Sequence, residues 1–317
     1  MSSQKKLIVV FGATGTTGGS VAKYLLEDGT FAVRAVTRNV NSEKAKALKA
    51  AGAEVVQADL DKAETIPPTL VGAYGVSGLT DFWTIFPTVG LDPAKAQAQE
   101  EVQGRLLVDA SKAAGVKHFV WFDLWHSDVP HWEGKYQVGE YLAKSGLPYT
   151  RVVNAFYMEN LSNPAFGMFK KTDDGKLLLT ISQPADTYVP SYSANQSGGW
   201  VLPCFKNPEK YLGKTIKTIS EHLTPKQFAE TLSKAVGKPV ELAPLSNEEF
   251  EAQRDSPNPY VKELYLNMKG FLKDCQPPNS VYGSEADSAA IYPGQYDFAT
   301  FVQKDADIQK FIASLKA

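Results

Sequence analysis

Residues 7–29 read "LIVVFGATGTTGGSVAKYLLEDG", and the fold prediction starts from this stretch. The continuous apolar run at its beginning is typical of a strand buried on both faces of a parallel sheet. Three glycines follow at three-residue spacing, and the remainder has apolar residues at helical spacing until Gly29 ends it. Strand, glycine-rich turn and helix in this order form a pyrophosphate site, because the helix N-terminus attracts negative charge.

The same alternation of short β-rich runs and helical stretches continues to about residue 155. Further strands are predicted at "AVRAVTR" (32–38), "AEVVQAD" (53–59), "GAYGVSGLTD" (72–81), "VKHFVWFD" (116–123) and "PYTRVV" (148–153). Six strands joined by helical crossovers predict an α/β protein with a doubly wound parallel sheet of the Rossmann type.

The pattern changes after residue 155. Strands are predicted in "DDGKLLLTIS" (173–182) and "GKTIKTIS" (213–220), and helices in "SANQSGGWVLPCF" (193–205) and after a Thr224 cap in "PKQFAETLSKAVG" (225–237). Residues 255–298 are rich in Pro, Gly, Asn and Ser, so irregular packed structure is expected there. We therefore expect a Rossmann domain over residues 1–155 and a smaller C-terminal α/β lobe over 156–317, some of whose elements can return to the main sheet.

Composition narrows the classes of partner. The net charge of −2 gives no basic field for nucleic acid or anionic lipid, so neither partner is expected. Cys204 and Cys275 form no disulfide framework and no metal spacing, which favours a reducing compartment. The start "MSSQKKLIVVFG" is too brief for a signal peptide, and no later run reaches about 18 apolar residues. A cytoplasmic protein is expected, with nuclear entry and oligomeric state left open.

The second predicted strand carries a clue to the cofactor. It ends in "VTRN", with Arg38 where an NAD site usually has a carboxylate for the ribose 2′-hydroxyl. A guanidinium matches a 2′-phosphate, which a carboxylate would repel, and Asn39, Ser42 and Lys44 follow closely. The sequence favours NADP(H) over NAD(H), although a solvated surface arginine would look the same.

The segment "HWEGK" (131–135) contains two candidate catalytic residues. His131 and Lys135 are one helical turn apart, so they lie on the same face of a helix. An imidazole can donate a proton near neutral pH, which makes His131 a candidate acid beside Lys135. A capping or core histidine explains His131 equally well. His126, Asp128 and His131 lack a metal-ligand spacing, so no metal is expected.

Several stretches resemble the NmrA-like family of atypical short-chain dehydrogenases. They are "VVFGATGTTGGSVAKYLLEDGTFAVRAVTRN" (9–39), "GKYQVGEYLAKSGLPYT" (134–150) and "FYMENL" (156–161), and the resemblance is closest to the NADPH-sensor branch. It implies a Rossmann domain that binds NADP(H). The family includes redox-sensing regulators with little or no dehydrogenase activity, and its isoflavone-reductase-like relatives reduce substrates with a lysine.

The resemblance also implies roles for individual residues. Those at the pyrophosphate would be Gly12, Ala13, Thr14, Gly15, Thr16 and Thr17, with Gly18 at the start of the helix. Arg38 would hold the 2′-phosphate, and Asp59 and Leu60 would border the adenine. Thr80, Asp81 and Phe82 would line the path to the nicotinamide, Lys135 would bond its ribose, and Tyr157, Met158, Glu159 and Asn160 would close over the ring.

The usual serine and tyrosine of the active dehydrogenases are missing. Phe122 or Asp123 stands where the serine would be, and Tyr136 lies about 100° round the helix from Lys135. This favours a redox-responsive sensor or regulator with a degenerate dehydrogenase site, acting on a protein partner. The alternative is an NADPH-dependent reductase of a small aromatic or unsaturated carbonyl-type substrate. An apolar pocket walled by aromatic residues would suit that substrate, although core packing explains those residues as well: Phe82, Trp83, Trp125, Trp132, Phe156 and Tyr157.

Overall fold

The computed structural model describes residues 5–163, 166–243 and 245–316, so the first four residues of the polar N-terminal stretch lie outside it. The chain forms two compact units. The first contains Met1–Asn154 and Asn195–Ile216, and the second contains Ala155–Ala194 and Lys217–Ala317. The chain therefore leaves the first unit after residue 154 and returns to it for residues 195–216.

The first unit is built on a seven-stranded sheet in the order β11-β6-β5-β4-β1-β2-β3. The strands are β1 (Leu7–Val10), β2 (Ala32–Thr37), β3 (Glu54–Gln57), β4 (Ala73–Gly78), β5 (His118–Asp123), β6 (Tyr149–Asn154) and β11 (Lys214–Thr218). Each neighbouring pair among the first six strands is parallel. The predicted α/β class with a Rossmann-type parallel sheet is confirmed.

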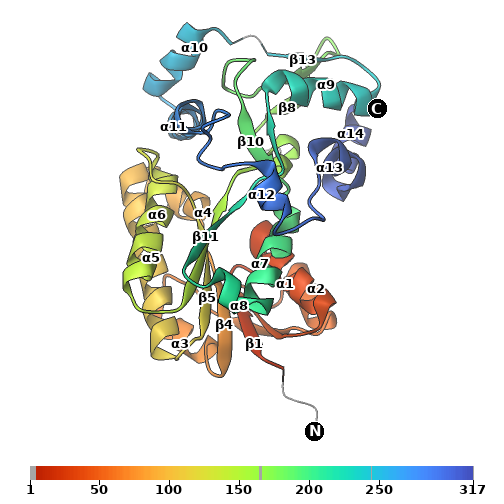
Figure 1. The fold of residues 1–317 in the computed structure, drawn as a ribbon. Helices are drawn as coiled ribbons and strands as arrows, with labels where there is room; N and C mark the ends of the chain where they lie inside the picture. The colour runs from red at the N-terminus through yellow and green to blue at the C-terminus, as the bar shows by residue number, and fades with distance from the viewer. Residues whose placement is uncertain (1–4, 164–165, 244, 317) are drawn as a thin grey trace. The chain divides into compact units, whose positions relative to one another are not determined.

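Helices cover both faces of this sheet, with α5 and α6 on one face and α1 and α7 on the other (Figure 1). The α5–α6 contact is close because Gly104 of α5 lies directly against Val138 of α6. Gly198 of α7 likewise packs on the backbone of α1 at Ser20. The helices are α1 (Thr16–Asp28), α2 (Glu43–Ala50), η1 (Ala63–Thr65), α3 (Ile66–Thr69), α4 (Phe82–Thr88), α5 (Pro93–Ala113), α6 (Pro130–Lys144), α7 (Ser197–Lys206) and α8 (Pro208–Tyr211).

The second unit contains two three-stranded sheets, in the orders β12-β10-β7 and β13-β9-β8. Their strands are β7 (Phe156–Tyr157), β10 (Val189–Tyr192), β12 (Glu221–Leu223), β8 (Phe169–Lys171), β9 (Leu177–Leu179) and β13 (Val240–Leu242). The helical segments of this part are η2 (Met158–Ser162), η3 (Ala194–Gln196), α9 (Pro225–Val236), α10 (Asn247–Ala252), η4 (Gln253–Asp255), α11 (Pro259–Asp274), α12 (Glu285–Ala289), α13 (Phe298–Lys304) and α14 (Ala306–Lys316). Thr224 caps α9 as predicted, in a capping box with Gln227.

The expectation of irregular structure over residues 255–298 is wrong for its first part. Residues 259–274 form α11, a 16-residue helix capped by Asn258 with Pro259 at its first position. Pro257 and Pro259 lie at the start of this helix, and Pro277 and Pro278 lie just beyond its end, where prolines permit a start and a stop. The composition of residues 255–298 as a whole therefore does not indicate the helix that lies between these prolines.

Three features of the described residues bear on partners. Cys204 and Cys275 are free and buried, and burial raises the pKa of both thiols. No described helix is both long and apolar enough to span a bilayer. The same residues contain no cluster of three or more His, Cys, Asp or Glu side chains suited to a metal ion.

Candidate functional site

The glycine-rich turn between β1 and α1 needs its glycines for different physical reasons. Gly12 has φ +62°, and a Cβ there would lie 2.8 Å from the Leu79 side chain. A Cβ on Gly18 would lie 2.6 Å from the backbone oxygen of Phe11, so the third glycine allows α1 to pack on the end of β1. These are the roles that the sequence pattern predicts for the first and third glycines of a dinucleotide site.

The turn is fixed to the carboxyl ends of its neighbouring strands. The Ala13 N–H donates to the Val36 carbonyl at 3.2 Å, and the Thr14 and Thr37 hydroxyl groups are 3.0 Å apart. Gly15 is the N-cap of α1, and no side chain of the described residues caps this helix end. Backbone N–H groups at the start of a helix are donors for an anion. The turn therefore fits a pyrophosphate group.

Arg38 and Asn39 follow β2 as exposed residues. Within the described residues the Arg38 guanidinium forms no ion pair, while its backbone oxygen accepts a hydrogen bond from Gln57 at 3.0 Å. The Asn39 side chain accepts the Asn41 N–H at 3.0 Å, and Ser42 caps α2 through the Ala45 N–H at 3.2 Å. Ser42 thus has a structural role, whereas Arg38 and the exposed Lys44 carry cationic groups available for a phosphate.

Asp59 and Leu60 follow β3 at the same edge of the sheet. The Thr65 hydroxyl donates to the Asp59 carbonyl at 3.0 Å and accepts the Asp59 N–H at 3.0 Å. The Asp59 carboxylate accepts the Asp61 N–H at 3.2 Å, and Leu60 packs partly against the core. These contacts hold the segment after β3 in a defined turn.

Lys135 on α6 forms an ion pair with Glu100 on α5. The Glu100 side chain is fully buried, whereas 15% of the Lys135 side chain is exposed. The same carboxylate oxygen accepts a hydrogen bond of 2.9 Å from the Thr80 hydroxyl, which follows β4. The second oxygen, Oε2, is buried without a hydrogen-bond partner among the described residues. Thr80, Glu100 and Lys135 thus form one polar group at the carboxyl end of β4.

The backbone of α6 is held close to this group. A Cβ on Gly134 would lie 3.0 Å from Glu100 Oε2, and the Trp121 indole N–H of β5 donates to the Lys135 carbonyl at 3.1 Å. Glu100 therefore fixes the side chain of Lys135 while Trp121 fixes its backbone. An ammonium group has three donors, so Lys135 keeps donors for a ligand after pairing with Glu100.

Sequence reasoning missed Glu100, although the sequence contains a signal for it. Glu100 lies on the stripe that α5 buries, together with Ala96, Gly104, Leu107 and Ser111. These positions are three or four residues apart, which places them on one helical face. A glutamate on an otherwise small or apolar stripe is a charge that needs a partner, since carboxylates are seldom buried unpaired.

His131 lies among aromatic side chains in the first unit. Its ring centroid is 5.2 Å from that of Trp83 and 5.5 Å from that of Phe82, and the residue is 8% exposed. Phe82 stacks on Phe86 at 5.3 Å and is itself buried. Of the predicted aromatic wall, Phe82, Trp83 and Trp132 contact His131 here. Asp81 is exposed and caps α4 through the Thr84 N–H at 3.3 Å.

The end of β5 has a structural ion pair where a catalytic serine would stand. Asp123 is buried and pairs with Arg151 of β6, which also donates to Glu140 at 2.7 Å. Burial raises the pKa of Asp123 to about 7, against the lowering effect of the Arg151 guanidinium. His126 bonds Glu133 at 2.8 Å. None of these contacts joins Asp123 or His126 to Lys135.

The predicted nicotinamide-covering residues belong to the second unit. The Tyr157 ring contacts the Tyr192 ring edge-on at 5.5 Å, and Met158 is buried. Glu159 accepts the Ser193 hydroxyl at 2.8 Å and the Ala194 N–H at 2.9 Å. Asn160 is half-buried in η2. Their role at a nicotinamide ring stays a prediction.

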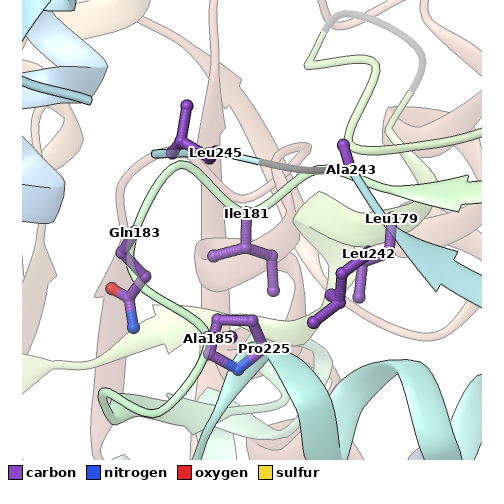
Figure 2. A pocket seen from close by; sticks show the side chains of 8 residues that line it. All are labelled: Leu179, Ile181, Gln183, Ala185, Pro225, Leu242, Ala243 and Leu245. Atoms are coloured by element: carbon purple, nitrogen blue, oxygen red, sulfur yellow. The ribbon is translucent and has the colours of Figure 1, made fainter. Parts of the chain in front are cut away.

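A pocket of about 140 Å³ also lies in the second unit. Figure 2 shows residues of and after β9, residues of and after β13 and the first residue of α9 around it. The lining residues are Leu179, Ile181, Gln183, Ala185, Pro225, Leu242, Ala243 and Leu245. None of the predicted site residues lines this pocket.

Comparison with known proteins shows the family of the chain. The family model described as the NmrA-like family matches residues 4–302. The chain belongs to the NmrA-like family. A relative in Aspergillus campestris, the NmrA-like family domain-containing oxidoreductase cpsB, is 32% identical over 264 residues, which cover 75% of each chain.

Solved structures show the same fold. The negative transcriptional regulator NmrA in complex with NAD superposes with a TM-score of 0.79 at 22% identity, over 98% of each chain. The Citrobacter sp. triphenylmethane reductase complexed with NADP(H) superposes with a TM-score of 0.72 at 22% identity, over 94% of this chain and 99% of that one. A regulator and a reductase therefore share the architecture, so the fold alone does not separate the two functions.

Proposed function

We propose that the first unit binds NADP(H) at the carboxyl edge of its sheet. The glycine turn and the uncapped start of α1 would hold the pyrophosphate, and Arg38 would hold the 2′-phosphate. The position of the turn after β1, with Arg38 after β2, supports this proposal. Neighbouring structures with NAD or NADP(H) support dinucleotide binding in general, and Arg38 supports the preference for the phosphorylated form.

Replacing Arg38 by alanine should weaken NADPH binding about 10- to 100-fold, since hydrogen bonds to charged groups contribute about 1.5–3 kcal/mol. NADH binding should change little, because NADH lacks the 2′-phosphate. Calorimetric titration of both dinucleotides measures the two affinities. Arg254→Ala removes a charge of the same sign from an exposed site and serves as the control. Equal weakening of NADPH and NADH by Arg38→Ala would contradict this assignment.

For the activity, we propose an NADPH-dependent reductase of a small aromatic or unsaturated carbonyl-type compound. The observation that carries this proposal is the ion pair of Lys135 with the fully buried Glu100, which holds the lysine in one place. Bound NADPH would supply a hydride. Lys135 would orient the nicotinamide ribose, and His131, one turn earlier, would donate the proton to the reduced substrate. The name of the Aspergillus relative, an oxidoreductase, adds support and outweighs the sequence-based preference for a regulator.

A redox-responsive sensor is the second candidate. The specific observation in its favour is that β5 ends in Asp123, which is bound to Arg151, instead of a serine available to a substrate carbonyl. A sensor also requires a partner that binds the NADPH-bound protein and the free protein with different affinities. A ligand shifts an equilibrium between two states only if it binds one state more tightly than the other.

NADPH oxidation measured against ketones, enones, quinones and imines separates the two candidates. The variant Lys135→Met combined with Glu100→Gln removes the lysine without leaving a buried charge. Turnover should be about 100-fold or more slower than in the wild type, both in this double variant and in His131→Gln. A factor of about 100 is the lower end of the range for the loss of a proton donor. Calorimetric NADPH binding is the control, and should survive in both variants.

Tight NADPH binding by the wild type without turnover of any compound would reject the reductase and favour the sensor. Turnover that persists in the double variant would reject Lys135 as the residue that orients the nicotinamide. Turnover that persists in His131→Gln would leave a bound water as the proton source.

A further inference from the structure

Three polar side chains of the second unit form a hydrogen-bonded chain that the proposed oxidoreductase site does not use. His222 on β12 lies between Glu285, the first residue of α12, and Ser280, in the segment before α12. His222 Nδ1 is 2.6 Å from Glu285 Oε1, and His222 Nε2 is 2.8 Å from Ser280 Oγ. A hydroxyl, an imidazole and a carboxylate in this order are the arrangement that activates a serine nucleophile.

The contacts assign a role to each ring nitrogen. The Glu285 carboxylate accepts both the His222 backbone N–H, at 3.1 Å, and the Nδ1 proton. Burial raises the pKa of Glu285, but the hydrogen bonds from His222 outweigh it and lower the pKa overall, so the carboxylate stays ionised at neutral pH. With the proton on Nδ1, Nε2 has a free lone pair that accepts the Ser280 hydroxyl proton.

The imidazole of His222 is more deeply buried than Ser280 is. The His222 side chain is 5% exposed, which restricts its motion, whereas Ser280 is half-buried. The Tyr282 N–H donates to Ser280 Oγ at 3.2 Å, and the Gly283 N–H closes a turn on the Ser280 carbonyl at 2.9 Å. The Tyr282 N–H therefore holds Ser280 Oγ in position beside His222 Nε2.

We propose that Ser280 is a nucleophile that accepts an acyl group from small activated esters or thioesters. Ser280 Oγ attacks the carbonyl carbon, and its proton moves to His222 Nε2. The bond from the carbonyl carbon to the alkoxide or thiolate breaks, and that leaving group takes the proton from His222. Water then attacks the acyl-serine with His222 as the base and releases the acid, so the cycle consumes one ester and one water. The Glu285 carboxylate orients His222 throughout.

A fluorophosphonate probe tests the nucleophile directly, because Ser280 Oγ would displace fluoride and gain a stable phosphorus ester. The intact protein should gain one probe mass, located at Ser280 by peptide mapping. Ser280→Ala should abolish labelling, and His222→Gln should slow it about 100-fold or more, as expected for loss of a general base. Ser314→Ala, which removes a hydroxyl from α14, should label at the wild-type rate.

Glu285→Gln keeps the size and an acceptor oxygen but loses the charge, and should slow labelling at least about tenfold. Circular dichroism and thermal unfolding show whether each variant is folded. If His222→Gln does not fold, Glu285→Gln tests the proposal in its place. Release of p-nitrophenol from p-nitrophenyl acetate should follow the same order of variants. No labelling of Ser280 in the folded wild type, or labelling at an equal rate in folded His222→Gln and Glu285→Gln, would overturn the proposal.

Discussion

Replacing Lys135 by alanine should lower the free energy of unfolding by about 3–5 kcal/mol, the range for breaking a buried ion pair by removing one partner. The physical reason is that the Glu100 side chain is fully buried and cannot turn to water. Its carboxylate would keep a single hydrogen bond, from Thr80, and one oxygen already lacks a partner among the described residues. Chemical denaturation at pH 7 measures the loss.

Replacing Glu100, the other partner of the ion pair, should lower the free energy of unfolding much less. Glu100→Gln leaves Lys135 without its partner, but 15% of that side chain already reaches solvent, so we expect a loss of about 1–2 kcal/mol. Glu100→Gln with Lys135→Met should recover most of the stability that Lys135→Ala loses, since neutral side chains of similar size avoid the desolvated charge.

Equal losses for Lys135→Ala and Glu100→Gln would contradict this account. They would mean that Glu100 reaches water, or that the two side chains do not depend on one another. A double-mutant cycle over the two positions gives the coupling energy directly, which for residues in contact is about 0.5–3 kcal/mol.

Replacing Gly18 by alanine should cost about 3 kcal/mol of stability, the upper end of the usual cost of overpacking. The added Cβ would lie 2.6 Å from the Phe11 carbonyl oxygen, and the obstacle is backbone, which has no rotamer to escape into. Thermal unfolding measures the loss. NADPH affinity should fall as well, because α1 would have to move away from the turn that faces the pyrophosphate.

Gly19→Ala is the matched control one residue further along the same helix. Its Cβ would lie 3.2 Å from the Ala13 oxygen, and alanine favours a helix over glycine by about 1 kcal/mol, so the two effects nearly cancel. A Gly18→Ala protein as stable as the Gly19→Ala protein would show that α1 does not pack on β1 as closely as described.

Local patterns in the sequence account for most of the first unit. The strand–glycine–helix stretch and the apolar runs predicted β1 to β6 and the helices α1, α2, α5 and α6, because each pattern is read within one element. The short helices α3 and α4 were not predicted. In the second unit the same reasoning predicted α9 from its Thr224 cap but did not predict α11. The helix-breaking residues before and after α11 give residues 255–298 the composition of a loop, although the residues between them form a helix.

The sequence by itself determined the α/β class with parallel strands, the glycine turn and the position of Arg38 after β2, because each is read from the order of local patterns along the chain. Only the tertiary structure decided the partners of the polar side chains. Glu100 and Lys135 are 35 residues apart, and His222 and Ser280 are 58 residues apart. Hydrophobic periodicity specifies which face of an element is buried. It does not specify which side chain of another element meets a buried charge, because that depends on helix packing and strand order across the whole unit.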